Sequence, residues 1–516
     1  MPAYLPRISV SLVFARRRLV QALGGGVLLI LGLAVSASAG AISASRHQPA
    51  RQASASVARS TPTATPKPHL PQSNSSTPST TWYFAEGYTG SSWTEYLTLA
   101  NFNSVSAHVT VQYDLGSGGP ITKQYTVSAN SRSTVTVNTD VGANQTVSAI
   151  VTSDQPIVAE RPLYFTYTAL SGYSIPSGTD VLGAPQLGTS FYFDYLDTST
   201  GHDTWLTILN PSGSSMTATI QYTSAAGVAL TPVTHTISAT SRSTVHVNTE
   251  SVLASAPGVY WAQVTLSAAG LVERPLYLQD TITGYTGAAD VIGVAAPQSA
   301  WSFAEGYTGT GYNERYLLTN PSATTPTVVT LTLYQSTGTT NTFSTTLAPG
   351  QQQLFNVTNL NAIFNAAILN GAQVQAALPI LVDRFVSFST TVSSITTPGA
   401  SETSGTSAPG AQFYFAEGYT GTDFLEYLSI LNPDPNNAAT VSVTFAPASG
   451  GSATVKTYTI NAHTRFSLDT STVMPTQAFS MLVQVTAGPT IVAERVMYFA
   501  YGGTQTGGTA IVGYQP

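Results

Sequence analysis

The chain has 516 residues, of which 42% are apolar and only 8% charged, with a net charge of −6 and no cysteine. So apolar a sequence is not disordered throughout, and the lack of a basic region removes the electrostatic basis for binding nucleic acid. The absence of cysteine excludes disulfides and thiolate metal sites, so the stability of the fold must come from packing.

Residues 1–39 have the pattern of an export signal. Arg16-Arg17-Arg18 precedes an apolar run at 19–35, and Ala37-Ser38-Ala39 offers a cleavage site of small residues before Gly40. If the segment is not cleaved, residues 19–39 can anchor the chain in the membrane as a helix, with the arginines on the cytoplasmic side. Both interpretations predict an extracellular or cell-surface location for the rest of the chain.

Residues 40–80 are rich in Ser, Thr, Pro and Ala, as in Ser60-Thr61-Pro62-Thr63. This composition cannot form a packed core and predicts a disordered linker or stalk.

A nine-residue motif then recurs along the chain. It stands at Trp82–Gly90, Trp301–Gly309 and Phe413–Gly421, and a degenerate copy occupies Phe191–Asp197. Its third residue repeats with a period of about 110 residues, at Phe84, Phe193, Phe303 and Phe415. We therefore expect four tandem modules, numbered 1 to 4, at 81–187, 188–298, 299–398 and 412–516, with a short linker at 399–411 before the last.

Within a module, short alternating segments and turn residues predict about seven strands, for example at His108–Tyr113 and Ser133–Asn138. That number of strands is typical of an immunoglobulin-like β-sandwich. The alternative is a propeller in which one repeat supplies two blades. The strand spacing does not divide cleanly into fours, which argues against the propeller. Short joints between modules favour a semi-rigid linear string.

Three segments of module 1 together resemble an uncharacterised β-sandwich repeat of bacterial surface and secreted proteins. These are Trp82–Gly90 (W-Y-F-A-E-G-Y-T-G), Glu95–Asn101 and Ile157–Phe165. The resemblance extends over residues 82–516 and implies the fold of the module, but no activity and no catalytic residues. Module 2 departs from the motif at Tyr195 and Leu196, and module 3 departs at 382–385.

Charged residues are scarce, so those that recur are informative. An acid–arginine pair closes every module, and two glutamates recur in modules 1, 3 and 4. Adjacent residues on a strand point to opposite faces, so one of each pair must be covered and therefore paired. We expect structural ion pairs within each module. They join Arg161 to Glu86 or Glu95, Arg384 to Glu305 or Glu314, and Arg495 to Glu417 or Glu426. Module 2 lacks both glutamates, so Arg274 must pair with Asp194, Asp197 or Asp203, or be more exposed. The alternative is a set of ligand-reading or acid–base carboxylates.

Aromatic residues follow the recurring glutamate in the head loop of three modules. Packed, they belong to the core or to joints between modules; exposed, they can stack against sugar rings. The candidate ligand-binding residues are Tyr88, Trp93, Tyr307, Tyr312, Tyr419 and Phe424.

The sequence contains no catalytic, phosphate-binding or dinucleotide-binding motif. Histidines such as His202 and His246 have no partner at metal-ligand spacing, so no metal or cofactor is predicted. We therefore expect a non-enzymatic, exported surface protein that acts in adhesion or as an envelope spacer, with a surface protein or envelope glycan as its partner. The alternative is an array that binds carbohydrate or peptidoglycan through the head-loop aromatics.

Overall fold

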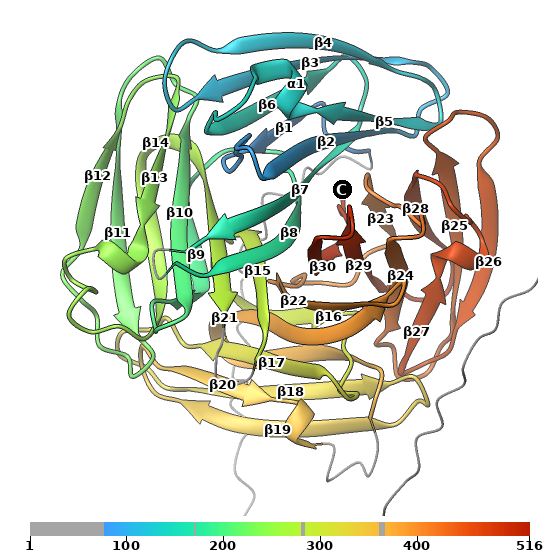
Figure 1. Ribbon diagram of the computed structural model, residues 1–516. Coiled ribbons are helices and arrows are strands. Elements are labelled where there is room, and N and C mark those ends of the chain that lie inside the picture. Colours follow the sequence, from blue (N-terminus) through green and yellow to red (C-terminus); the bar gives the residue numbers. More distant parts are fainter. Residues whose placement is uncertain (1–76, 170–171, 280–283, 361–366) are drawn as a thin grey trace, which may run out of the picture. The chain divides into compact units, whose positions relative to one another are not determined.

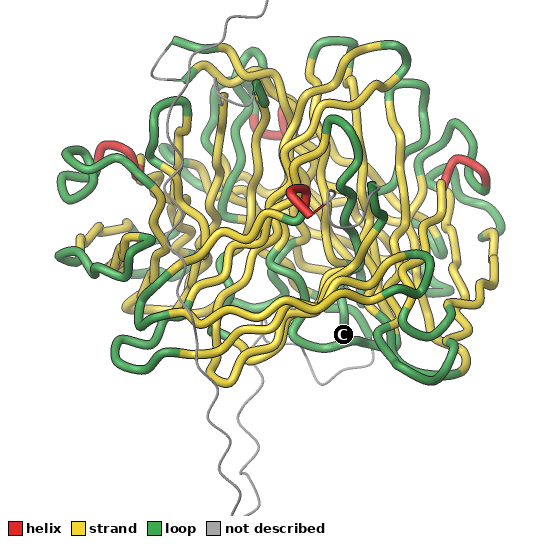
Figure 2. Tube along the Cα trace, turned by 90° about the horizontal axis from the view of Figure 1, so that it is seen from below, coloured by secondary structure: helices red, strands yellow, loops and turns green. Residues whose placement is uncertain are grey.

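The computed structural model describes residues 77–169, 172–279, 284–360 and 367–516. The expected export signal and residues 40–76 of the expected linker lie outside the described residues. Strands are the predominant element of the described chain, connected by loops and a few single helical turns, as Figure 2 shows. The prediction of an all-β protein built from tandem repeats is confirmed.

Modules 1 and 4 each consist of two four-stranded antiparallel sheets, and in modules 2 and 3 a long strand joins the two sheets into one of seven strands. In module 1 the first sheet has the order β1 (Thr81–Phe84), β6 (Val147–Ser153), β3 (Ala107–Leu115) and β4 (Ile121–Val127). The second sheet has the order β5 (Ser131–Thr136), β2 (Trp93–Asn101), β7 (Val158–Thr168) and β8 (Ser174–Leu182). One turn of α-helix, α1 (Val137–Val141), follows β5.

The other modules repeat this order, except that one long strand serves both sheets in modules 2 and 3. Module 2 contains β9 (Gly188–Asp197), β10 (His202–Asn210), β11 (Met216–Ser224), β12 (Val233–Ile237), β13 (Ser241–His246), η1 (Val247–Thr249), β14 (Val259–Gln279) and β15 (Thr286–Ile292). Module 3 contains β16 (Gln298–Phe303), β17 (Tyr312–Thr319), β18 (Thr327–Gln335), β19 (Thr340–Leu347), β20 (Gln352–Asn356), η2 (Thr358–Leu360), β21 (Asn370–Val392) and β22 (Ile395–Thr403). Module 4 contains β23 (Gln412–Phe415), β24 (Phe424–Asn432), β25 (Ala439–Pro447), β26 (Thr454–Ile460), β27 (Thr464–Asp469), η3 (Thr470–Thr472), β28 (Phe479–Ala487), β29 (Val492–Tyr501) and β30 (Gln505–Val512).

The strand order differs from the immunoglobulin-like order expected from the sequence. An immunoglobulin domain pairs its first strand with its second, whereas β1 pairs with β6, and β7 pairs with β2. Modules 2 and 3 show the same order with a long strand in place of two. The first half of β14 pairs with β9 and β11 and its second half with β10 and β15, so consecutive segments lie in opposite sheets. Modules 1 and 4 each have an eighth strand, one more than predicted, whereas modules 2 and 3 have the predicted seven.

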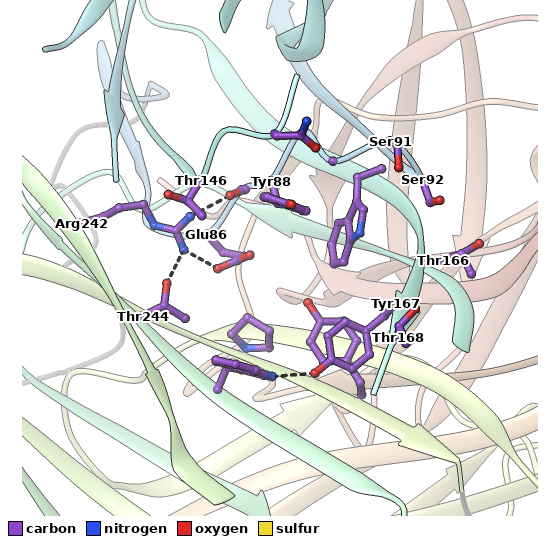
Figure 3. A pocket seen from close by; sticks show the side chains of 17 residues that line it. Glu86, Tyr88, Ser91, Ser92, Thr146, Thr166, Tyr167, Thr168, Arg242 and Thr244 are labelled. Atoms are coloured by element: carbon purple, nitrogen blue, oxygen red, sulfur yellow. Dashed lines mark hydrogen bonds and ion pairs between the residues drawn. The ribbon is translucent and has the colours of Figure 1, made fainter. Parts of the chain in front are cut away.

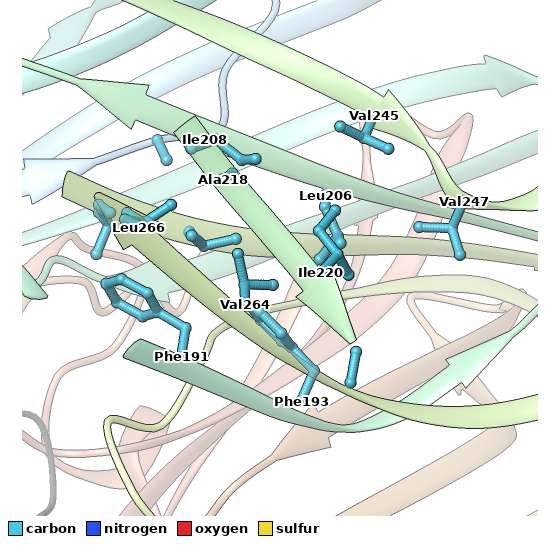
Figure 4. Packing of buried hydrophobic residues seen from close by; sticks show 14 of the residues in the cluster. Phe191, Phe193, Leu206, Ile208, Ala218, Ile220, Val245, Val247, Val264 and Leu266 are labelled. Atoms are coloured by element: carbon cyan, nitrogen blue, oxygen red, sulfur yellow. The ribbon is translucent and has the colours of Figure 1, made fainter. Parts of the chain in front are cut away.

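The core of each module lies between its two sheets. Figure 4 shows this for module 2, where Phe191 and Phe193 of β9 meet Leu206 and Ile208 of β10 and Val264 of β14. All five side chains are buried, and full burial of such a side chain contributes about 1.5–3 kcal/mol. The apolar residues of the strands therefore form the core that holds the module together.

A buried asparagine closes the second strand of the repeat. The Asn101 amide donates to the carbonyl oxygens of Val105 and Val127, and the equivalent amides repeat the arrangement. These residues are Asn101, Asn210, Asn320 and Asn432. Their side chains satisfy turn carbonyls that would otherwise be buried without a partner, which makes them structural.

The four modules form a closed, propeller-like ring, so the expected linear string is wrong. Figure 1 shows module 4 beside module 1, and β8, β15, β22 and β30 at the centre. Small residues allow this approach: a Cβ added to Gly399 of β22 would lie 2.9 Å from the Gly507 Cα of β30. Each quarter of the ring is one two-sheet module, not two blades.

Residues 399–403 of the expected linker belong to β22, which leaves 404–411 as the joint.

Candidate binding site between modules 1 and 2

The arginine that closes each module is buried and reaches into the next module around the ring. Arg161, Arg274, Arg384 and Arg495 are all at most 1% exposed. Their ion-pair partners are Glu273 and Asp290 for Arg161, Glu402 for Arg274, Glu494 for Arg384, and Glu160 and Asp180 for Arg495. The last pairs close the ring from module 4 to module 1. The ion pairs expected within modules are thus pairs between modules.

A second arginine crosses each of three interfaces in the opposite direction, and the sequence analysis missed it. Arg242 of module 2 pairs with Glu86 of module 1 at 2.8 Å, and the Thr207 hydroxyl donates to the same carboxylate. The equivalent pairs are Arg465 with Glu305 and Arg132 with Glu417. The recurring Ser-Arg-Ser at 131–133 and 241–243 was the available signal.

The interface between modules 2 and 3 is built differently. Gln352 takes the place of the second arginine and donates to Asp194 Oδ1 at 3.0 Å. Asp194 in turn stands where the other modules have an alanine of the head motif, such as Ala85. The expectation that Arg274 uses Asp194, Asp197 or Asp203 is wrong, since its partner is Glu402 of module 3.

The recurring glutamates Glu95, Glu314 and Glu426 are at most 1% exposed and form no ion pair with an arginine in the described structure. Burial raises the pKa of Glu95 to about 8, of Glu314 to about 7 and of Glu426 to about 8. The carboxyl oxygens of Glu95 have no hydrogen-bond partner among the described residues. At neutral pH the Glu95 and Glu426 carboxyls are therefore predominantly protonated.

These raised pKa values predict a fold that is more stable at pH 6 than at pH 8. Between the unfolded pKa near 4 and the folded pKa near 8, each carboxyl is protonated when folded and ionised when unfolded. Raising the pH through this window should lower the free energy of unfolding by about 1.4 kcal/mol per pH unit for each such group. Urea unfolding at pH 6, 7 and 8 measures this slope. The Glu95→Gln, Glu426→Gln double variant should show a shallower slope, and equal slopes would contradict the assignment.

A pocket of about 410 Å³ opens at the interface between modules 1 and 2. Figure 3 shows the Glu86–Arg242 pair on one side and Ser91, Ser92 and Tyr167 on the other. Its aromatic lining comes from both modules: Tyr88, Trp93, Tyr167, Trp205 and Tyr277. Its hydroxyl and amide lining includes Ser91, Ser92, Asn144, Thr146, Thr166 and Thr244. A concave site of this size with convergent polar groups is typical of small-ligand binding.

The aromatic walls of the pocket are held by their own packing. Trp93 stacks on Phe165 at 4.3 Å between ring centroids, and Tyr167 of module 1 stacks on Tyr277 of module 2 at 3.8 Å. Trp205 stacks on His246 at 4.0 Å and donates from Nε1 to the Tyr167 hydroxyl. These contacts fix the rings before any ligand arrives, so binding does not have to order them.

The candidate aromatics of the other modules also lie at interfaces. Tyr307 packs edge-on against Tyr312, which contacts Tyr498 of module 4. Tyr419 packs against Phe424, which contacts Tyr164 of module 1. Of the six candidates, the structure places Tyr88 and Trp93 in the pocket between modules 1 and 2.

Histidines that the sequence left without partners do have acidic neighbours. His246 Nε2 lies 3.0 Å from Asp203 Oδ1, and His202 Nε2 lies 3.6 Å from Asp197 Oδ2. Among the described residues, no group of three or more His, Cys, Asp or Glu side chains is arranged to hold a metal ion.

Within the described ranges, none of the helices has the length and apolar character needed to cross a membrane. Residues 19–39, the segment expected to act as signal or anchor, are not among them.

No protein-family model and no curated protein matches the chain. Among solved structures, similarity is found to the crystal structure of Thermotoga maritima 1070, at 13% identity over 20% of this chain and 93% of that chain, with a TM-score of 0.18. The Anabaena sensory rhodopsin transducer aligns at 24% identity over 17% of this chain and 97% of that chain, with a TM-score of 0.15. A tetra-tandem repeat from the extending region of a large adhesion protein aligns at 12% identity over 81% of this chain and 93% of that chain, with a TM-score of 0.10. At these TM-scores the likenesses carry no conclusion about fold or function.

Proposed function

We propose that this protein is an exported, non-enzymatic binding protein that holds a neutral saccharide in the pocket between modules 1 and 2. The observation that carries the proposal is the lining of that pocket, which combines preorganised aromatic rings with many hydroxyl groups. A pyranose presents apolar C–H faces to aromatic rings and hydroxyls to polar groups around its edge. This mixture of contacts fits a sugar better than an apolar ligand, which would leave the polar lining without partners.

The charges of the pocket argue for a neutral ligand. Glu86 and Arg242 are the charged residues of its lining, and they pair with each other at 2.8 Å. A carboxylate or ammonium on the ligand would have to compete with this pair, which is almost fully buried. Neutral hexoses and N-acetylated sugars carry no charge, so they would not compete with the Glu86–Arg242 pair.

The same pair supports the absence of catalysis. Glu86 is held by Arg242 and Thr207, so its carboxylate is not free to act as a nucleophile or base. Glu95 is 1% exposed and lies behind Gly87, whose added Cβ would be 2.6 Å from Glu95 Oε1. Glycoside hydrolysis requires two carboxyl groups that both reach the scissile bond.

The cell-surface location rests on the sequence of residues 1–39, and a glycan of the envelope or of another cell is the corresponding partner. Adhesion is compatible with a closed ring that carries a pocket. The alternative role as an envelope spacer loses the support of a linear string of modules, because the ring folds the four repeats back onto one another.

We expect a screen against immobilised neutral glycans to find binding that Trp93→Ala abolishes. Trp93 supplies an aromatic wall, and loss of such an anchor in a ligand site costs about 2 kcal/mol or more, at least thirtyfold in Kd. Tyr88→Ala should weaken binding as well.

The matched control is Tyr419→Ala, because Tyr419 holds the position equivalent to Tyr88 in module 4, outside this pocket. It should leave binding unchanged. Equal loss in Tyr88→Ala and Tyr419→Ala would show that the pocket is not the site, and binding of acidic glycans alone would contradict the neutral ligand.

A further inference from the structure

A second pocket, of about 270 Å³, lies next to the first on the module 2 side of the interface. Tyr277 lines both pockets. Thr168 lines the first pocket, and the next residue in the chain, Ala169, lines the second. The two hollows are therefore neighbours separated by little more than the stacked rings of Tyr167 and Tyr277. We propose that the two pockets are consecutive subsites for one saccharide chain, which crosses this aromatic partition. This proposal rests on the proposed function of the first pocket.

The partition between the pockets is rigid and joins the two modules. The Tyr167 hydroxyl of module 1 donates to Asp203 Oδ2 of module 2 at 2.9 Å, and Asp203 Oδ1 faces His246 Nε2 at 3.0 Å. Trp205 donates to the same Tyr167 hydroxyl at 3.2 Å. Asp203 lines the second pocket and Tyr167 and Trp205 line the first, so one hydrogen-bond network shapes both.

The second pocket offers the chemistry of a sugar subsite. Its wall is the turn at 198–201 and the start of β10 at His202 and Asp203. The turn presents the hydroxyls of Ser199 and Thr200, while Pro257 and Tyr277 give the pocket apolar surface. His202 Nδ1 is buried and has no hydrogen-bond partner among the described residues. A buried polar atom without a partner is costly, and a small rotation of the imidazole toward the pocket would let a ligand hydroxyl or amide remove that cost.

The sequence explains why this loop differs from its equivalents. Module 2 has lost the Glu-Gly-Tyr of the head motif and carries Tyr195, Leu196 and Asp197 instead, with His202 in the place of Trp93. A polar imidazole therefore faces the second pocket where the first has an indole. The first pocket is thus suited to stack on a ring, and the second to hydrogen-bond the next ring.

The test measures the affinity of the full exported chain for neutral oligosaccharides of increasing length. Cello-oligosaccharides and chito-oligosaccharides from disaccharide to hexasaccharide serve as probes, with isothermal titration as the readout. Two linked subsites should make the hexasaccharide bind about tenfold or more tightly than the disaccharide. His202→Ala should reduce hexasaccharide affinity about tenfold and leave disaccharide affinity unchanged.

Ser199→Trp is the second variant, because a large side chain on the loop should block the second pocket without touching the buried network. His108→Ala, an exposed histidine paired with Asp154 in module 1, is the matched control and should change neither affinity. The two-subsite proposal would be overturned if affinity did not depend on oligosaccharide length, or if neither His202→Ala nor Ser199→Trp changed the affinity for the hexasaccharide. Either result would leave the proposed function of the first pocket intact. Failure of every neutral saccharide to bind would overturn the proposed function and this inference with it.

Discussion

Replacing Arg495 by alanine should destabilise the folded ring by about 3–5 kcal/mol. The guanidinium is fully buried, and it pairs with Glu160 at 2.7 Å and with Asp180, both in module 1. Its removal leaves two carboxylates buried without their cation, and that is the costly outcome, since an intact buried pair contributes little by itself. Chemical unfolding of the variant and its parent at pH 7.5, followed by tryptophan fluorescence, measures the difference.

Two further variants test the physical cause of this loss. Lys456→Ala removes a positive charge from the exposed face of β26 in the same module and should change stability by less than about 0.5 kcal/mol. Arg495→Met combined with Glu160→Gln and Asp180→Asn removes the whole charged group and should recover part of the loss. The Arg495→Ala penalty should also shrink at pH 5, where the stranded carboxyls can protonate. An Arg495→Ala chain as stable as its parent would show that the ring is not closed through these contacts.

The location of the partners decides how this experiment must be done. In an isolated module 4 the acids Glu160 and Asp180 are absent, so the same substitution should cost much less there than in the whole chain. Recurrence of the acid–arginine pair predicted that the arginines are covered, because charges are scarce and adjacent residues of a strand face opposite ways. It did not reveal the partners, which lie as far as 335 positions away in the chain.

The same limit applies to the fold: features set by neighbouring residues in the chain were predicted, and features set by contacts between modules were not. The recurring nine-residue motif located the modules. Apolar alternation and turn residues predicted most of their strands, since those signals are set by neighbours in the chain. The eighth strand was missed because β8 reads Ser-Gly-Thr-Asp at 177–180, small and polar residues with no apolar alternation. Such residues suit a strand covered on both faces by other modules, and that environment exists only in the closed ring.

The candidate site was predictable only in part for the same reason. Tyr88 stood out because it belongs to a repeated motif and Trp93 because it follows that motif, and both line the pocket. Trp205 and Tyr277 complete it from module 2, where the motif is degenerate and gave no signal. A site assembled from two modules requires knowledge of which surfaces meet, and the chemistry of one repeat does not contain that information.

Gly287→Ala should destabilise the centre of the ring, with a loss of about 3 kcal/mol. A Cβ at this position of β15 would lie 2.4 Å from the backbone nitrogen of Ala400 and 2.7 Å from the carbonyl carbon of Gly399 in β22. Both atoms belong to the backbone of the neighbouring module, so no side chain can rotate to make room. Modules 2 and 3 would have to move apart at the centre, where all four last strands pack.

The matched control is Gly213→Ala, because a Cβ at Gly213 meets no atom within 4 Å. That variant should be as stable as its parent or slightly more stable, because alanine restricts the unfolded chain. Thermal unfolding of both variants compares the same substitution, glycine to alanine, at a site that contacts β22 and at a site that does not. If Gly287→Ala has the same melting temperature as Gly213→Ala and the parent, then β15 and β22 are not in contact at the centre of the ring. The closed arrangement of modules 2 and 3 would then have to be abandoned.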